Sequence, residues 1–337
     1  MSRTSTVFPS DKEITYTNWG RSALEAVFRA DDLTGGTVLL PAFICQTSFS
    51  RLFERVDLTP VFVDIDPETY EIDPEHAQEH IDQVDAAVVV HPFGFPAQID
   101  VWTDLCAEHD VVLVEDCVRA LGAQYNGRVV GDFGDHAVYS LHKTAPVARG
   151  GAVASVGNPR GYLGDPVYDA FSLYHALPAH TREVVSLSYP TEYELRRLDE
   201  LTRQEFISFL STQFDDHVAA LEDRAARLRE SLEPLGFQFQ PKSSGRRSFL
   251  IPALAPGGTD RNDLMDYVRA NVDHSPLKVV WPNPWAKSYA GNAFERRYPA
   301  TKEVSDRILC FKVRLMDDAT VESTIDTIHS FMRTFPS

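Results

Sequence analysis

Apolar runs with the length of single strands recur through the first half of the chain, and helical patterns separate them. The clearest run, Ala86–Val90, holds no polar residue, which is typical of a strand whose two faces are both covered by helices. Similar runs lie at Thr37–Leu40 and Val111–Val114, and Val61–Asp66 is a further predicted strand. Strands that alternate with helices in this way predict an α/β fold with a mostly parallel sheet sandwiched by helices.

Two of the predicted strands end in residues with chemical function. The run Val111–Val114 leads into Asp116, and a second short strand, Ala137–Leu141, leads into Lys143. Ligands of open α/β sheets bind outside the carboxyl ends of the strands, so this carboxylate and this amine are candidates for one site. The Pro and Gly-Gly of residues 144–151 predict a tight loop beside the lysine.

The second half of the chain predicts a smaller α+β unit. Residues 199–235 show a long amphipathic helical pattern, and Ser248–Leu254 and Leu277–Trp281 have strand character. Helical patterns follow at Asp260–Val272 and Ala319–Phe335. Residues 161–190 show no clear period, and we expect loop and short helix there.

The stretch EDCVRALGAQYNGRVVGDFGDHAVYS, which begins at Glu115, resembles the DegT/DnrJ/EryC1/StrS aminotransferases. These are enzymes of fold type I that use pyridoxal 5'-phosphate (PLP) and act mostly on keto-sugar nucleotides. The resemblance also rests on Lys143 with its Gly-Gly loop and on Asn18–Leu24, and it extends from about Asn18 to the C-terminus. It implies the PLP-dependent transferase fold type I, with a large PLP-binding domain at 1–225 and a small C-terminal domain at 226–337.

PLP requires an amine that holds it covalently, an acid at its ring nitrogen, donors for its phosphate and a flat or apolar cover for its ring. The resemblance implies that Lys143 is the amine and Asp116 the acid, and we predict both as catalytic residues. Ser22 and Ala23, at a predicted helix start, are expected to contact the phosphate. Ser140 is expected there too, although it lies three residues before the lysine, whereas most family members place it five before.

The cover of the ring is less clearly indicated. Many family members have an aromatic residue at the position of Cys45, so Cys45 is either a cofactor contact or simply a small buried residue; Phe43 and His91 are the substitutes. Arg119 is expected to contact the 3-hydroxyl of the ring. Arg149 is a candidate for the donor carboxylate or for nucleotide phosphates, with exposure to solvent as the alternative.

The resemblance implies an aminotransferase that moves an amino group from an amino acid, such as glutamate, to a keto sugar nucleotide in surface polysaccharide or glycan biosynthesis. It also implies a homodimer. The alternatives are a PLP enzyme acting on a non-sugar ketone and a regulatory or sensor protein that retains the fold. Sugar dehydratases of this family carry His in place of the lysine, so Lys143 argues against that branch. A nicotinamide dehydrogenase is rejected because no G-x-G-x-x-G is present.

The chain is strongly acidic, with a net charge of −17. Such a surface repels nucleic acid and anionic membranes, so neither is expected as a partner. Only seven lysines accompany 25 arginines. Few lysines with excess Asp and Glu are typical of salt-loaded cytoplasms, where salt near 1 M shortens the Debye length to about 3 Å and screens self-repulsion. We therefore hypothesise a halophilic host, with an ordinary acidic protein as the alternative.

Cysteine spacing and hydropathy bear on location. The four cysteines are scattered and form no CxxC pair, as expected in a reducing compartment. No apolar run approaches the ~18 residues of a membrane-spanning helix, and no apolar leader is present. We expect a soluble cytoplasmic protein.

One sequence motif suggests a metal. Residues His76–His80, HAQEH, match the H-x-x-E-H pattern of some zinc peptidases. The predicted helix at 74–84 would bury Ala77, Ile81 and Val84 and leave both histidines toward water without an evident third ligand. We therefore expect the match to be accidental and predict no metal site.

Overall fold

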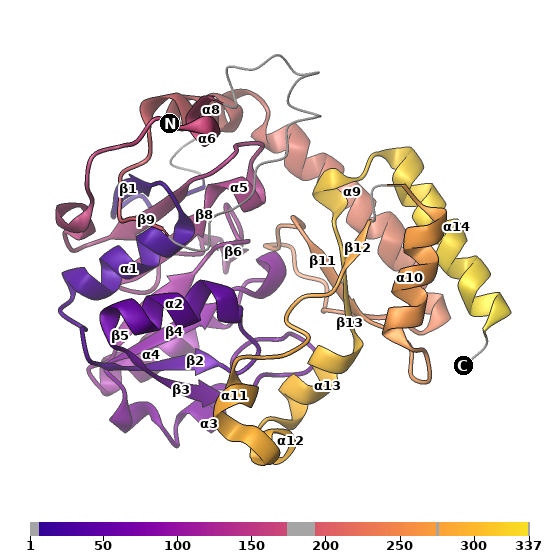
Figure 1. The fold of residues 1–337 in the computed structure, drawn as a ribbon, viewed down its shortest axis with the longest axis horizontal. Helices are drawn as coiled ribbons and strands as arrows, with labels where there is room; N and C mark the ends of the chain where they lie inside the picture. Colours follow the sequence, from indigo (N-terminus) through magenta and orange to yellow (C-terminus); the bar gives the residue numbers. More distant parts are fainter. Residues whose placement is uncertain (1–6, 174–192, 274–275, 336–337) are drawn as a thin grey trace.

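The computed structural model describes residues 7–173, 193–273 and 276–335. Two sheets lie side by side in it, a large one formed by the first half of the chain and a small one formed by the second (Figure 1). No helix within these described ranges is long and apolar enough to cross a bilayer.

The large sheet has the strand order β1-β9-β8-β5-β4-β2-β3. Its members are β1 (Glu13–Thr17), β2 (Thr37–Pro41), β3 (Thr59–Val63), β4 (Ala86–Val90), β5 (Val112–Asp116), β8 (His136–Ser140) and β9 (Gly151–Ser155). Strands β2, β3, β4, β5 and β8 run parallel, whereas β9 is antiparallel to both of its neighbours. The predicted fold class, a mostly parallel sheet sandwiched by helices, is confirmed. The edge strand β1 was not predicted.

Helices cover both faces of this sheet because alternate strand residues are apolar on both sides. Val38 and Leu40 of β2 pack with α1 (Gly20–Ala30) and α2 (Gln46–Val56), whereas Leu39 packs with α4 (Ile99–Glu108) on the other face. All three β2 side chains are 0% exposed. A strand that is buried on both faces loses the polar alternation of an exposed sheet, and this is what the apolar runs indicated.

The helix predicted at 74–84 is much shorter in the structure. Helix α3 covers only Pro74–Ala77, and a 3-10 turn follows at Ile81–Gln83. Ala77 and Ile81 are nevertheless buried, at 0% and 1% exposed. The pattern thus predicted the buried residues but not the helix length, since isolated helices shorter than about 12 residues are marginal without tertiary packing.

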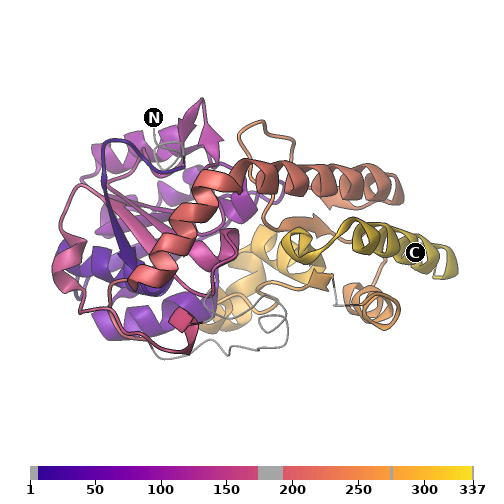
Figure 2. The same ribbon diagram turned by 90° about the horizontal axis from the view of Figure 1, so that it is seen from above.

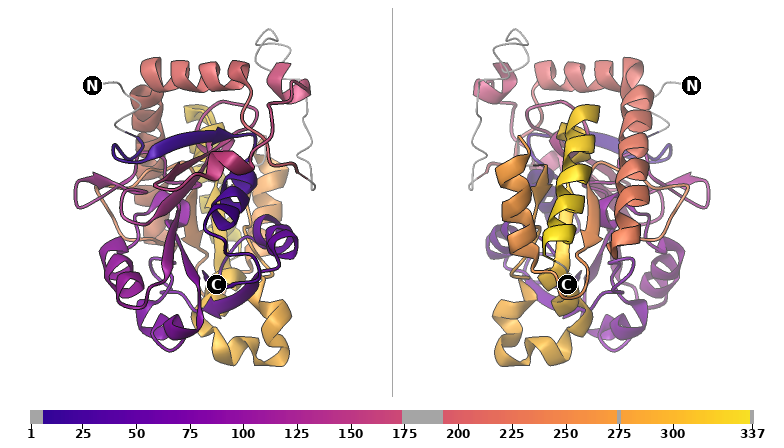
Figure 3. Two further views of the ribbon diagram at one scale, coloured as in Figure 1. Left: turned by 90° about the vertical axis from the view of Figure 1, so that its left-hand side faces the viewer. Right: turned by 90° about the vertical axis from the view of Figure 1, so that its right-hand side faces the viewer.

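The small sheet is antiparallel, with the order β10-β11-β13-β12. Its strands are β10 (Gln238–Phe239), β11 (Ile251–Leu254), β12 (Leu277–Lys278) and β13 (Ile308–Phe311). Helices α9 (Phe214–Leu232), α10 (Arg261–Asn271) and α14 (Asp318–Thr334) pack beside it (Figure 3). The predicted strands at 248–254 and 277–281 are present in shortened form, whereas β13, which pairs with both β11 and β12, was not predicted.

The amphipathic region 199–235 forms two helices, α8 (Glu200–Thr212) and α9, which break at Gln213. Helix α8 packs on the large sheet through Phe206, and α9 continues toward the small sheet (Figure 2). The boundary at 225/226 falls within α9, so the division into two domains stays a prediction.

The remaining elements are short. They are a hairpin of β6 (Gln124–Tyr125) and β7 (Arg128–Val129), and helices α5 (Leu141–Thr144), α6 (Ala170–Leu173), α11 (Ala286–Ala290), α12 (Phe294–Arg297) and α13 (Pro299–Arg307). The hairpin turns through Asn126 and Gly127, whose φ angles of 48° and 81° are those of a type I′ turn. Part of the loop predicted at 161–190 lies outside the described residues.

Candidate active site

A cavity of about 750 Å³ lies at the carboxyl ends of β4, β5 and β8, where they meet the first turn of α1 and strand β12. Parallel strands bring their carboxyl ends to one edge of a sheet, and this edge carries the ligand sites of open α/β folds. Five of the seven predicted site residues line the cavity: Cys45, Asp116, Arg119, Ser140 and Lys143.

Lys143 lies in α5, a single turn that directly follows β8. Its side chain forms no hydrogen bond or ion pair with any residue that the structure describes. Burial lowers the pKa of Lys143, and the nearby Arg119 guanidinium lowers it further. A lowered pKa increases the fraction of neutral amine, which is the form that attacks a carbonyl carbon or accepts a proton.

Asp116 is the last residue of β5 and is 9% exposed. Its Oδ1 accepts a hydrogen bond from the Val118 amide at 2.9 Å. Burial raises the pKa of Asp116, whereas the Val118 amide and the Lys143 ammonium act to lower it. Lys143 and Asp116 therefore face one cavity, and each influences the pKa of the other.

The first turn of α1 forms one wall of the cavity. Gly20 and Arg21 line it, and a Cβ placed on Gly20 would lie 3.2 Å from the Cβ of Ser140. This close approach sets the start of the helix directly against the end of β8. Free backbone N–H groups and the positive end of the helix dipole suit a phosphate at this point.

Ser22 and Ala23, the predicted phosphate contacts, do not line this cavity. The Ser22 hydroxyl is buried and donates to the Glu194 carbonyl at 3.1 Å. The Ala23 amide donates to the Trp19 carbonyl at 3.1 Å, as in an ordinary first helical turn. Both side chains are buried on the inner side of α1, away from this cavity, and their role as phosphate contacts stays a prediction.

The wall around Cys45 is more aromatic than the sequence suggested. Phe43 is 3% exposed and does not line the cavity, whereas Phe93 and Trp281 do, with their rings stacked at 5.6 Å. Cys45 caps α2 and contacts the hydroxyl of Ser48 at 3.3 Å. Burial opposes ionisation of the thiol, but Lys143 and the hydroxyls of Ser48 and Thr47 lower the pKa of Cys45 overall.

His91 lines the cavity, and hydrogen bonds at both of its ring nitrogens hold the ring in place. Its Nδ1 accepts a hydrogen bond from the Ala97 amide at 3.0 Å, so the ring proton is on Nε2, which donates to Glu115 at 3.0 Å. Glu115 is 0% exposed and accepts three further hydrogen bonds, from the amides of Gly131, Phe133 and Gly134. Burial opposes the charge, yet these donors lower the pKa of Glu115. His91 is therefore a rigid wall of the cavity.

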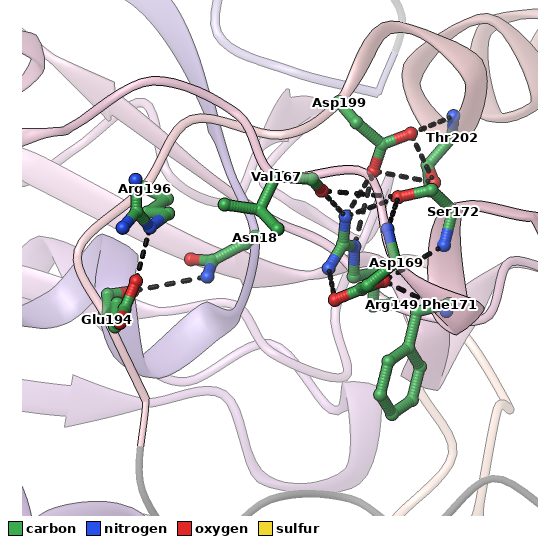
Figure 4. Close-up of polar contacts among 10 residues, drawn as sticks. All are labelled: Asn18, Arg149, Val167, Asp169, Phe171, Ser172, Glu194, Arg196, Asp199 and Thr202. Atoms are coloured by element: carbon green, nitrogen blue, oxygen red, sulfur yellow. Dashed lines mark hydrogen bonds and ion pairs between the residues drawn. The ribbon is translucent and has the colours of Figure 1, made fainter.

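Arg149 is not available to a ligand. It is 3% exposed and lies in a network with Asp199 at 2.6 Å, Asp169 at 2.8 Å and Ser172 at 2.6 Å (Figure 4). The same guanidinium donates to the Val167 carbonyl at 2.7 Å. The prediction that it binds a donor carboxylate or nucleotide phosphates, or else faces solvent, was wrong. Instead, it fixes the loop after Lys143 to the start of α8.

The residues that line the cavity but were not predicted from the sequence include Arg21, Lys278 and Trp281. Arg21 lies between two residues that were considered, but its side chain was passed over for the hydroxyl of Ser22. Lys278 is one of only seven lysines, and that scarcity, which drew attention to Lys143, applies equally to it. Trp281 carried no signal, because an aromatic residue after a strand is usually part of a core.

The H-x-x-E-H motif does form a cluster, in which His76, Glu79 and His80 offer atoms within 4.8 Å of one another. However, His76 Nδ1 accepts a hydrogen bond from the Asp64 amide at 3.2 Å, which places the ring proton on Nε2. Metal coordination requires a nitrogen without a proton. Neither nitrogen of His76 meets this condition without loss of the Asp64 contact.

The whole fold is similar to that of 3-amino-5-hydroxybenzoic acid synthase, with a TM-score of 0.74 over 96% of this chain and 87% of that chain, at 24% identity. The cavity offers PLP an amine, a carboxylate and a helix start on different walls, so the residues present fit the cofactor. The likeness shows a shared fold, and the cavity residues suit the cofactor that the sequence resemblance implies.

The sequence comparisons point to a particular family. Residues 8–158 match the model of the DegT/DnrJ/EryC1/StrS aminotransferase family. It is similar to GDP-perosamine synthase of Vibrio cholerae, 34% identical over 148 residues, which cover 43% of this chain and 40% of the relative. It is also similar to a pleiotropic regulatory protein of Geobacillus stearothermophilus, 31% identical over 126 residues, 37% and 34% of the two chains. The match thus spans less than half the length of these relatives.

Proposed function

We propose that this protein is a PLP-dependent aminotransferase that moves an amino group from an amino acid, such as glutamate, to a keto sugar nucleotide. The observation that carries the proposal is that Lys143 and Asp116 face one cavity and act on each other electrostatically. The name of the Vibrio cholerae relative supports a sugar as the acceptor. A role in surface polysaccharide or glycan biosynthesis, in the cytoplasm and as a homodimer, is part of the proposal.

Each residue of the site has its own role toward the cofactor. When bound, PLP supplies an electron sink for the carbon that loses or gains a proton. Lys143 holds the cofactor through its amine and, when free, moves the proton at the substrate carbon. Asp116 keeps a proton on the ring nitrogen, because a nearby carboxylate favours the protonated form. Gly20, Arg21 and Ser140 hold the phosphate.

Absorbance tests the proposal directly. The purified protein with PLP is expected to show a visible yellow band that bleaches when glutamate is added and returns with a keto acceptor. Lys143→Ala should lose the band and at least about 10³-fold of the turnover, since it removes the group that moves the proton. Lys287→Ala, which changes an exposed lysine of α11 outside the cavity, is the matched control. A Lys143→Ala variant with the normal band would refute the assignment.

A regulatory or sensor role is the second candidate, and the name of the Geobacillus relative supports it. In that case the yellow band would form with Lys143, but no amino donor would bleach it. A screen of amino acids and of nucleotide-linked keto sugars separates the two functions, and non-sugar ketones belong in the same screen.

We also propose a halophilic host from the charge of −17 and the seven lysines. Molar salt screens repulsion between exposed carboxylates, so the melting temperature should rise from dilute buffer to concentrated KCl. An unchanged or lower melting temperature would contradict this.

A further inference from the structure

Lys278 is a cation of the small sheet that reaches the cavity of the large one. It is the last residue of β12, where it pairs with Cys310 of β13, and it lines the cavity together with Lys143. Its neighbours in the sheet are rigid, since Leu277 and Cys310 are 1% and 0% exposed. The position of its backbone is therefore fixed by the core of the small sheet.

The ammonium group of Lys278 has no partner among the residues that the structure describes. Within the described ranges its side chain makes no hydrogen bond or ion pair, although it is half-buried. Burial lowers its pKa to about 8, and Arg119 and Lys143 contribute to the shift as neighbouring cations. A cation in this position destabilises the unliganded protein unless an anion is bound beside it.

The composition of the cavity wall indicates the same need for an anion. Its charged residues are five cations and two carboxylates: Arg21, Arg51, Arg119, Lys143 and Lys278 against Glu54 and Asp116. The chain as a whole has the opposite balance, with 49 acidic and 32 basic residues. If the phosphate of PLP lies at Arg21 and its ring between Lys143 and Asp116, Lys278 is left for a different anionic group.

We propose that Lys278 is a substrate-binding residue that holds an anionic oxygen group, either a carboxylate of the amino donor or a phosphate of the acceptor. An ammonium group presents three donors on a flexible stem and binds either group as a point charge. This inference rests on the proposed function and deepens it, because it assigns the recognition of substrate charge to the small sheet.

The test is equilibrium binding to the PLP-loaded protein, without turnover. Glutarate, which has the carboxylates of glutamate but no amine, probes the donor arm, and uridine and guanosine diphosphates probe the acceptor arm. Each is titrated by calorimetry into wild type, Lys278→Met, Lys278→Arg and the control Lys287→Met at one fixed ionic strength. Lys278→Met should weaken one of the two ligand classes by about 10-fold or more, since a charge-assisted hydrogen bond is lost. Lys278→Arg should retain most of that affinity.

The binding data distinguish a role of Lys278 toward the donor from a role toward the acceptor. Weaker glutarate binding alone assigns Lys278 to the donor, and weaker diphosphate binding alone assigns it to the acceptor. Unchanged binding of both ligands by a Lys278→Met protein that keeps the yellow band would overturn the inference. Loss of the band in Lys278→Met would also overturn it, because Lys278 would then hold the cofactor. Failure of the proposed function shows separately, in wild-type protein whose band does not bleach with any donor.

Discussion

Two cations, the buried Arg149 and the partly buried Lys143, lie six positions apart in the sequence and have opposite surroundings. Arg149 has hydrogen bonds to two carboxylates, a hydroxyl and a backbone carbonyl (Figure 4). Lys143 has no partner among the residues that the structure describes. A buried charge whose partners are all present has a structural role. An unpaired one lowers the free energy of unfolding and indicates that a ligand binds beside it.

The largest effect is expected from Arg149→Met. Asp199 is 0% exposed and also caps α8, so removal of Arg149 leaves a buried carboxylate without its counter-ion. We expect a loss of about 3–5 kcal/mol in the free energy of unfolding, measured with urea. Arg203→Met, which breaks an exposed pair with Glu200, is the control and should cost less than about 1 kcal/mol.

The cost of Arg149→Met should depend on pH. Although burial opposes the charge, the Thr202 amide and Arg149 lower the pKa of Asp199. The stability from this pairing is therefore present above the unfolded pKa of an aspartate, near 3.9, and is lost as pH falls through the folded value. A loss of unfolding free energy in Arg149→Met that is small at pH 7, or that increases in acid, would contradict the structural role of Arg149.

Lys143→Met should raise the free energy of unfolding of the cofactor-free protein, whereas Arg149→Met lowers it. Replacing an unpaired, partly buried ammonium with an apolar side chain of similar length should stabilise it by about 1 kcal/mol. Burial and Arg119 lower the pKa of Lys143, so the wild-type penalty is complete below the folded pKa and decreases as pH rises from there toward the unfolded pKa of a lysine, near 10.4. Thermal melts from pH 6 to pH 10 measure this, and a clear loss of stability at pH 7 would break the contrast.

The smallest effect is expected from Ser22→Ala, which also distinguishes the two predictions for the phosphate. The Ser22 hydroxyl bonds the Glu194 carbonyl, so its loss should cost about 1 kcal/mol of stability and leave PLP affinity unchanged. Arg21→Ala should instead weaken PLP binding. Fluorescence titration with PLP separates the two, and a weaker affinity in Ser22→Ala alone would support the original prediction.

Much of the fold could be predicted because its signals are local. The apolar runs of β2, β4 and β5 and the residues at their carboxyl ends are adjacent in the sequence, and parallel pairing then brings Asp116 and Lys143 to one edge. Helix lengths and the strands β1 and β13 could not be predicted. Short segments become helix or strand only through packing against distant parts of the chain.

The sequence by itself predicted which residues have the chemistry for PLP, since Asp116, Ser140 and Lys143 each lie at or just after the end of a strand that the pattern already marks. Only the tertiary structure decided which charges have partners. Arg149 meets Asp199 across 50 positions, and Lys278 reaches the cavity from a different sheet. The physical reason is that a strand end is a local property, whereas the pairing of a buried charge depends on which distant segments pack against it.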